Sequence, residues 1–286
     1  MQLPQGCTIK TIAESELEAI WLSNAHCEAL ISLHGAQVLK FYAKAKQQEL
    51  LWLSEQAQYQ SGKAIRGGIP LCFPWFGAHP TDHQLPAHGF ARQQLWQLTA
   101  ISLDDAGHHL IFELQDSAAS RQLWNYAFKL QMHIHCGASL ELELHVQNLD
   151  QQPFSFSFAW HSYFALPAQQ VKVRGLAALT YIDQLDGHQH KQQETELLNF
   201  TAELDRIYPK TSGEFVLTSE AEPEIEIKSS ACSAVIWNPW IEKTKRLNDV
   251  AENAWQDFIC VETGQIASET QSLAAGEQLQ YRLKIT

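Results

Sequence analysis

One segment of the chain is a predicted strand in which large and small side chains alternate, and it ends at a histidine. From Phe154 to His161, aromatic residues alternate with small ones, so Ser155, Ser157, Ala159 and His161 share one face of a strand. A row of small side chains leaves room above the strand for a ligand, and an imidazole at its end can serve as a general acid or base. The alternative is an ordinary surface histidine or a hydrogen-bonded core histidine.

A second segment is a predicted apolar strand that is followed directly by a carboxylate residue. The run from Phe258 to Val261 is followed by Glu262 and then by Thr263 and Gly264, which we interpret as a turn. Partial desolvation at the rim of an apolar strand tunes the pKa of a carboxyl group, as a general base requires. The alternative is an exposed glutamate that opens the turn.

Two loops combine arginine with glycine. Arg66 precedes Gly67 and Gly68, and Arg92 closes the run that begins at His88 and Gly89. Glycine lets the backbone approach a ligand closely, and the planar guanidinium suits phosphate oxygens. Each loop alone also fits an ordinary turn.

Other candidate sites are weaker. His133 and His135 share a strand face, as two metal ligands would, but we identify no third ligand and expect no metal and no cofactor. Most tryptophans are expected in the core, and Trp75, Trp237 and Trp240 are the ones near the candidate segments. Nucleophile-elbow, P-loop and dinucleotide motifs are absent from the sequence.

The elements that must position these residues are strands, because the dominant pattern has period 2. Phe128 to Cys136 and Leu140 to Val146 alternate strictly and predict an antiparallel hairpin. Further strands are expected at Glu18–Leu22, Glu28–Leu33, Gln37–Tyr42, Leu50–Leu53, Leu95–Asp104, His109–Gln115, Phe154–Trp160, Glu214–Leu217, Glu224–Lys228, Ala234–Trp237, Phe258–Val261 and Leu279–Ile285. The sequence therefore predicts an all-β fold, a large antiparallel β-sandwich.

Residues 1–286 are expected to form a single domain, since no linker rich in Pro, Gly or Ser divides them. The least patterned stretches run from Ser61 to Arg92, from Thr180 to Thr211 and from Asn238 to Gln256. Long loops on a β scaffold usually carry the binding residues.

Charge and composition exclude several kinds of partner. The net charge is −12, and the 20 Lys and Arg residues form no basic run, so we expect no nucleic-acid partner. The first ten residues do not resemble a secretory signal, and we find no apolar stretch of membrane-spanning length. The six cysteines are widely spaced without a C-x-x-C pair, which favours reduced thiols and a cytoplasmic protein.

Five ordered motifs give the chain a family resemblance. It resembles the aldose-1-epimerase superfamily, and within it the hexose-6-phosphate mutarotase (glucose-6-phosphate 1-epimerase) branch, over about residues 20–285. The motifs are IRGGIPLCFPWFG (65–77), HGFAR (88–92), FAWHSYF (158–164), LDRIY (204–208) and FICVETG (258–264).

The resemblance implies a galactose-mutarotase-like supersandwich and assigns roles to residues. It implies that His161 is the general acid and Glu262 the general base. It implies that Arg66, Arg92 and Asp205 bind the sugar phosphate, and that His88 lines the same cleft; Trp75 and Trp237 are further candidates for substrate contact. Some relatives carry a substrate-binding glutamine before the HGFAR histidine, whereas this chain has Ala87, so that contact is missing or comes from another side chain.

The expected activity is a cofactor-independent isomerase reaction, the interconversion of α and β anomers of a hexose 6-phosphate by acid/base ring opening and reclosure. A monomer is expected. The alternatives are a mutarotase for free aldoses, a non-catalytic carbohydrate-binding β-sandwich, and a glycosidase or lyase that uses Asp205 with Glu262 as paired carboxylates.

Overall fold

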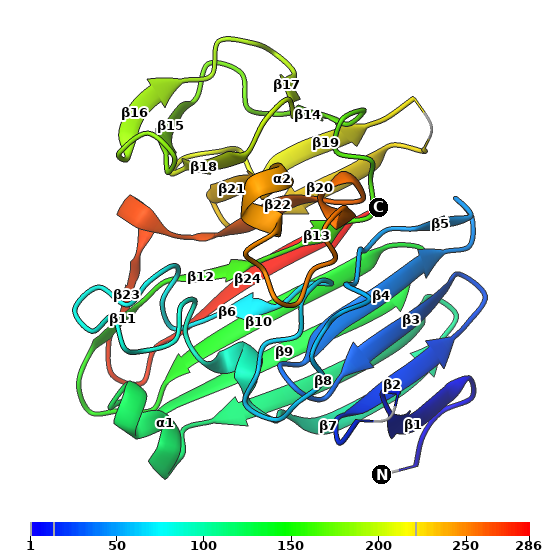
Figure 1. The fold of residues 1–286 in the computed structure, drawn as a ribbon. Helices are drawn as coiled ribbons and strands as arrows, with labels where there is room; N and C mark the ends of the chain where they lie inside the picture. The colour runs from blue at the N-terminus through cyan, green and yellow to red at the C-terminus, as the bar shows by residue number, and fades with distance from the viewer. Residues whose placement is uncertain (1, 14, 221) are drawn as a thin grey trace.

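A computed structural model describes residues 2–13, 15–220 and 222–286 as antiparallel sheets stacked on one another (Figure 1). Every pair of named strands is antiparallel, which confirms the predicted all-β sandwich. None of the helices in these ranges is long and apolar enough to cross a membrane.

The first strands form a five-stranded sheet, blue in Figure 1, in front of strands β7–β10. Its strands in order are β1 (Cys7–Thr11), β2 (Glu18–Ser23), β3 (Cys27–Ser32), β4 (Gln37–Ala43) and β5 (Gln48–Glu49).

A nine-stranded sheet forms the middle of the molecule. Its strands in order are β17 (Leu198–Asn199), β14 (Lys172–Arg174), β19 (Glu214–Thr218), β20 (Ile225–Ser229), β24 (Gln278–Ile285), β10 (Leu140–Asn148), β9 (Phe128–Gly137), β8 (Gly107–Gln115) and β7 (Gln97–Asp104). The predicted hairpin is confirmed, because Cys136 pairs with Leu140 and the register continues to Phe128 opposite Asn148.

An eight-stranded sheet carries the segments with candidate chemistry. Along it lie β16 (Gln189–Gln192), β15 (Thr180–Asp183), β18 (Leu204–Tyr208), β21 (Ser233–Asn238), β22 (Ile259–Gln265), β12 (Phe158–Trp160) and β6 (Leu71–Cys72), while β13 (Tyr163–Phe164) pairs with β22. The remaining elements are the pair β11 (Phe154–Phe156) and β23 (Gln271–Leu273), the helices α1 (Ala118–Leu123) and α2 (Trp240–Thr244), and the 3₁₀ turns η1 (Ala91–Gln93), η2 (Ala254–Gln256) and η3 (Ala267–Glu269).

One apolar core joins the three large sheets. Side chains of all three belong to it, for example Ile31 of β3, Phe112 of β8 and Ile236 of β21. The eight-stranded sheet is buried on both faces, because Ile236 and Val261 point into this core, whereas Val235 and Trp237 belong to a second apolar cluster. The single domain expected from the sequence stays a prediction.

Several expectations about individual strands were wrong. The segment Thr180–Thr211 contains β15, β16, β17 and β18, whose short and partly polar sequences show no period. Leu50–Leu53 makes only isolated bridges next to β5. The stretch Phe154–Trp160 is divided at Ser157 into β11 and β12, which pair with different strands.

Glu262 is inside β22 and not at its end, so the expected turn after it was wrong. The strand continues to Gln265, with Gly264 between Ala159 of β12 and Ser233 of β21. A Cβ atom on Gly264 would lie 2.0 Å from the carbonyl oxygen of Phe158. This glycine therefore permits a close approach of two strands and does not mark a turn.

We expect Gly264→Ala to lower the free energy of unfolding by about 3 kcal/mol, since neither strand can move away without losing ladder hydrogen bonds. Urea unfolding followed by tryptophan fluorescence measures the change. Gly187→Ala is the control: its Cβ would meet no atom within 4 Å, and its φ of +59° costs about 1 to 2 kcal/mol. Equal losses in the two variants would contradict the steric explanation.

Candidate active site

His161 lies in the short link between β12 and β13. Its backbone N–H donates to the carbonyl oxygen of Pro70 over 3.0 Å, which fixes the link. Its ring stacks on Tyr163 with centroids 4.6 Å apart and an interplanar angle of 9°, and it meets Trp237 edge-on at 5.9 Å. Aromatic packing on two sides orients the imidazole and leaves it 6% exposed.

The row of small residues before His161 has a different use from the one predicted. Ser157 accepts a hydrogen bond from the N–H of Phe76 over 3.0 Å, and its own N–H donates to Pro74. Ala159 is fully buried and belongs to an apolar cluster that includes Cys72 and Tyr163. Protein segments therefore fill the space above Ser157 and Ala159.

Glu262 faces His161 from the neighbouring strand. Its Oε1 lies 3.3 Å from Nε2 of His161, and the carboxylate residue is only 2% exposed. Burial is the main cause that raises the pKa of Glu262 well above its ordinary value, with the charge of Asp205 adding to the effect. Burial likewise lowers the pKa of His161 well below its ordinary value, and His88 and the arginines lower it further.

Two atoms of this pair have no hydrogen-bond partner among the described residues. They are Nδ1 of His161 and Oε2 of Glu262, and both are buried. An unsatisfied buried polar atom costs about 1 to 3 kcal/mol, so native proteins rarely keep one without a use for it. Both residues line one cleft.

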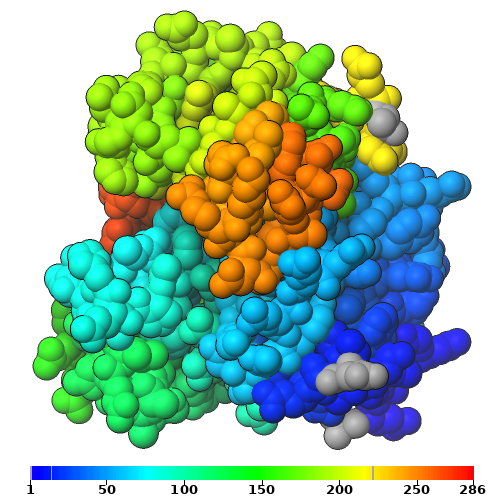
Figure 2. All heavy atoms as spheres, viewed as in Figure 1, coloured from blue at the N-terminus to red at the C-terminus, as the bar shows by residue number. Residues whose placement is uncertain are grey.

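The cleft measures about 280 Å³ and brings most of the predicted residues together. It opens where the loops around residues 66–88, the segment 184–205 and the α2 region meet, coloured cyan, yellow-green and orange in Figure 2. The predicted residues that line it are Arg66, His88, His161, Asp205, Trp237 and Glu262. The lining residues that the sequence did not indicate are Phe76, Gly77, Gln184, Ile207, Val235, Lys243 and Leu247.

Arg92, Trp75 and Trp240 lie outside this lining. Arg92 donates to the carbonyl oxygen of Ala87 over 3.1 Å, while its Nε is buried without a partner in the described ranges. Its charge lowers the pKa of His88, so it lies within electrostatic reach of the cleft. The indole N–H of Trp75 donates to the carbonyl oxygen of Pro86, and Trp240 packs on Trp255. In the structure these two tryptophans therefore support loops.

Arg66 is held at the cleft by two neighbours. Its Nε donates to Oδ2 of Asp249 over 3.1 Å, and a terminal nitrogen donates to the hydroxyl of Tyr163 over 2.9 Å. Tyr163 and Asp249 raise the pKa of Arg66 above its ordinary value. Since Tyr163 also stacks on His161, one side chain positions both the guanidinium and the imidazole.

His88 presents a neutral ring to the cleft. Its backbone is in the left-handed region, with φ of +66°, and its N–H donates to the carbonyl oxygen of Gly77 over 2.7 Å. The N–H of Gly77 in turn donates to Nδ1 of His88 over 3.3 Å. Burial, with help from Arg92 and Arg66, lowers the pKa of His88 to about 3. Because Nδ1 accepts, the proton is on Nε2, which makes His88 a hydrogen-bond donor.

Asp205 and Lys243 provide charge on the other side of the cleft. Asp205 is on β18, opposite Trp237 of β21, and burial raises its pKa to about 6. Lys243 is on α2, and its Nζ lies 3.8 Å from a carboxylate oxygen of Glu203. The cleft thus has two cationic side chains, Arg66 and Lys243, around a carboxyl group that can accept from a hydroxyl.

Comparisons with known proteins identify the family of the chain. The family model described as aldose 1-epimerase matches residues 18–286. An Escherichia coli K12 protein named "Putative glucose-6-phosphate 1-epimerase" is 33% identical over 262 residues, covering 90% of this chain and 86% of the relative. A Cenchrus ciliaris protein of the same name is 29% identical, covering 100% and 89%. The solved structure of a "putative mutarotase" from Salmonella typhimurium superposes with a TM-score of 0.90 at 29% identity, covering 100% of this chain and 95% of that one.

The low pKa of His88 predicts a pH-dependent stability. Between about pH 6.5 and 3 the unfolded chain binds a proton at His88 that the folded chain does not, so stability rises with pH in this window and is lost as pH falls. We expect His88→Asn to flatten the slope of unfolding free energy against pH by about 1.4 kcal/mol per pH unit. Urea unfolding at several pH values from 6 to about 4.5 measures the slope. A slope equal to that of the wild type would contradict a His88 that is neutral in the folded protein.

Proposed function

Because the chain belongs to the aldose 1-epimerase family, we propose that it interconverts the α and β anomers of a hexose 6-phosphate, with His161 and Glu262 as its acid/base pair. The observation that carries this proposal is the buried His161–Glu262 contact of 3.3 Å, with one unpartnered atom of each residue at the same cleft.

The reaction needs two proton transfers. Ring opening removes the proton from the C1 hydroxyl and adds a proton to the ring oxygen, which gives the open-chain aldehyde. After rotation about the C1–C2 bond, reclosure reverses both transfers on the other face of the carbonyl. One group must accept a proton while another donates one, and each such group contributes about 10² to 10⁴-fold to the rate.

The pair is suited to this chemistry when the two side chains share one transferable proton. The directions of the two pKa shifts favour the form in which Glu262 carries the proton and His161 is neutral. The family resemblance assigns the opposite starting form, with Glu262 as base and His161 as acid. Exchange of the proton across the 3.3 Å contact interconverts the two forms, and either form supplies one acid and one base.

A phosphate group fits the cations at the cleft. The protein has a net charge of −12. Two of its cationic side chains, Arg66 and Lys243, nevertheless line the same cleft. A phosphate monoester is mostly dianionic at neutral pH and accepts charge-assisted hydrogen bonds from both side chains. Arg92, behind His88, adds to the positive potential. We propose that these three side chains distinguish a hexose 6-phosphate from a free hexose.

The sugar hydroxyls are assigned to the remaining polar groups. Nε2 of His88 donates, the carboxyl group of Asp205 accepts, and the side chain of Gln184 can do either. Gln184 lines the cleft and offers the amide that Ala87 lacks. Trp237 provides an apolar surface for a sugar face.

A hexose phosphate is a cytoplasmic metabolite class, which agrees with the expected location and with six free thiols.

We expect His161→Asn and Glu262→Gln each to lower kcat by about 10²-fold or more, equivalent to roughly 2.7 kcal/mol, because each removes one of the two proton-transfer groups. Exchange NMR of the two anomers of glucose 6-phosphate measures the rate without a coupled enzyme. The test also separates the alternatives, since a carbohydrate-binding module gives no exchange and a hydrolase gives new products.

Thermal unfolding of the same two variants provides the control. Glu262→Gln keeps the size of the side chain, and His161→Asn replaces the ring with a smaller polar group. Both remove the ability to transfer a proton, and the fold should remain intact. A variant that keeps its fold and exchanges the anomers at the wild-type rate would remove that residue from the acid/base pair.

We expect Lys243→Met to weaken kcat/KM for glucose 6-phosphate by roughly 10 to 150-fold while leaving free glucose almost unaffected. The reason is that a hydrogen bond to a charged group is worth about 1.5 to 3 kcal/mol net. Arg66→Ala should likewise lower kcat/KM for glucose 6-phosphate more than for free glucose. Exchange NMR with both sugars measures the selectivity.

Lys245→Met is the matched control. Lys245 follows the same helix but pairs with Glu242 over 2.7 Å and does not line the cleft, so its loss should change neither sugar's rate. Equal losses for both sugars in Lys243→Met, or a wild-type protein that handles free glucose as well as the phosphate, would contradict the phosphate assignment and favour a free-aldose mutarotase.

A further inference from the structure

A second group of polar residues lies far from the cleft, on the outer face of the nine-stranded sheet. A hollow of about 670 Å³ crosses this face. The side chains that line it include His109 of β8, His133 and His135 of β9, and Glu143 of β10. The proposed sugar chemistry uses none of these residues, and the face opposite them is the apolar core that includes Met132, Ile134 and Leu144.

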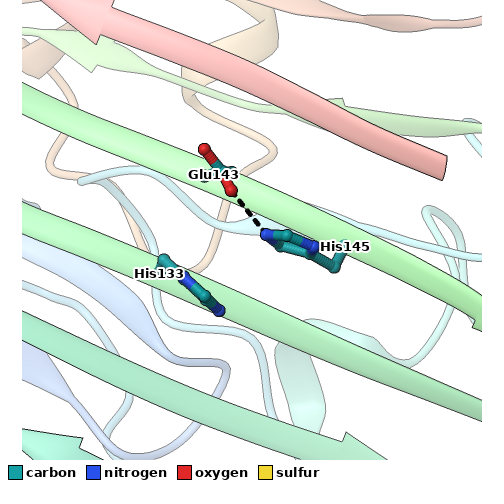
Figure 3. A group of neighbouring side chains, drawn as sticks. All are labelled: His133, Glu143 and His145. Carbon is teal, nitrogen blue, oxygen red and sulfur yellow. Dashed lines mark hydrogen bonds and ion pairs between the residues drawn. The ribbon is translucent and has the colours of Figure 1, made fainter. Parts of the chain in front are cut away.

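Strand register brings two residues of this hollow together with a third potential ligand, His145, which is outside its lining. Glu143 pairs directly with His133 across β9 and β10, and His145 follows Glu143 by two residues on the same face of β10. One nitrogen or oxygen atom of each of the three residues lies within 4.8 Å of those of the other two. Figure 3 shows the three side chains gathered beside the two neighbouring strands.

The cluster has the third ligand that the sequence analysis did not identify. The pair His133 and His135 on one strand suggested two ligands, and the structure instead joins His133 to residues of the adjacent strand. His135 stacks on His109 with centroids 4.3 Å apart and is not a member of the cluster. The hairpin register therefore selects which histidines converge.

One of the three ligand residues has an unused nitrogen. Nε2 of His133 is buried and has no hydrogen-bond partner among the described residues. Its ring stacks on that of His145 with centroids 4.6 Å apart and an interplanar angle of 28°. An imidazole nitrogen without a partner is free to give its lone pair to a cation, once His133 turns about its side-chain torsions so that both rings converge.

The other two ligand residues are oriented by neighbours. Nε2 of His145 lies 2.5 Å from Oε1 of Glu143, and a side-chain amide of Gln278 lies 2.9 Å from Nδ1 of His145. Arg282 donates from Nε to Oε2 of Glu143 over 2.8 Å. Outer contacts of this kind hold metal-binding imidazoles and carboxylates in place. They leave Nε2 of His145 and Oε1 of Glu143 directed at each other.

We propose that His133, Glu143 and His145 form a binding site for a divalent transition-metal ion, with Zn²⁺ as the first candidate. Two imidazoles and one carboxylate suit Zn²⁺, with metal–ligand distances of roughly 2.0 to 2.2 Å. Two ligand atoms at such distances from a tetrahedral ion are about 3.4 Å apart. The Glu143–His145 contact must open by just under 1 Å from its present 2.5 Å. The proton on Nε2 of His145 moves to Nδ1, where the Gln278 side chain turns to present its amide oxygen as the acceptor. Water completes the coordination from the hollow.

Titration of zinc sulfate into protein stripped with EDTA tests the site. We expect one ion per chain by isothermal calorimetry and an increase in Tm, because the ion links β9 to β10. His133→Asn, Glu143→Gln and His145→Asn should each weaken binding by at least about 100-fold, since loss of a ligand costs more than the 10 to 100-fold loss seen for outer contacts. Visible spectra of the Co²⁺-loaded protein report whether imidazole and carboxylate ligands are bound.

His135→Asn is the matched control. It removes a histidine from the same face of β9, two residues from His133, without touching the cluster, so zinc affinity should stay within about 2-fold of the wild type. Zinc binding that His135→Asn weakens as much as His133→Asn does, or that survives all three ligand substitutions, would overturn the proposal.

Anomer exchange should be the same in stripped and zinc-loaded protein, because the hollow and the cleft share no residue.

Discussion

The burial of a carboxyl group against an imidazole is the constraint on which this structure depends. Glu262 and His161 are 2% and 6% exposed, and the described residues give neither Oε2 of Glu262 nor Nδ1 of His161 a partner. Desolvation moves the two pKa values in opposite directions, so the neutral forms of both groups gain at the expense of the charged forms. A pair in this state can accept and donate a proton at little electrostatic cost, but only a rigid scaffold can keep it dry.

The eight-stranded sheet supplies that rigidity because it is packed on both faces. Along β21, Ile236 enters the central core while Val235 and Trp237 face the cleft side, and along β22 Val261 and Glu262 divide in the same way. The cleft face cannot shift without disturbing the core beneath it. Binding energy from a sugar substrate is therefore not needed to assemble the pair, which is the condition for preorganised acid/base chemistry.

Sequence patterns predicted what depends on local periodicity, and missed what depends on distant contacts. The hairpin of β9 and β10 and the aromatic face that ends at Trp160 were confirmed, because alternation alone assigns their faces. The continuation of β22 past Glu262 was missed, since a glycine needed for close approach resembles one in a turn. Lys243 gave no signal at all: it reaches the cleft from a helix of five residues, and only the fold brings that helix there.

Hydrogen-bond donors distinguish two glutamates of this protein, Glu262 and Glu143. No described donor reaches Oε2 of Glu262, and burial, with the charge of Asp205 adding to it, raises the pKa of this residue and favours the neutral acid. Partial burial would also raise the pKa of Glu143, but hydrogen bonds from His145, Gln280 and Arg282 outweigh it and lower that pKa. Each glutamate has a histidine partner, at 3.3 Å and 2.5 Å respectively. The same two residue types therefore suit proton transfer where donors are missing, and retain a carboxylate charge where donors are present.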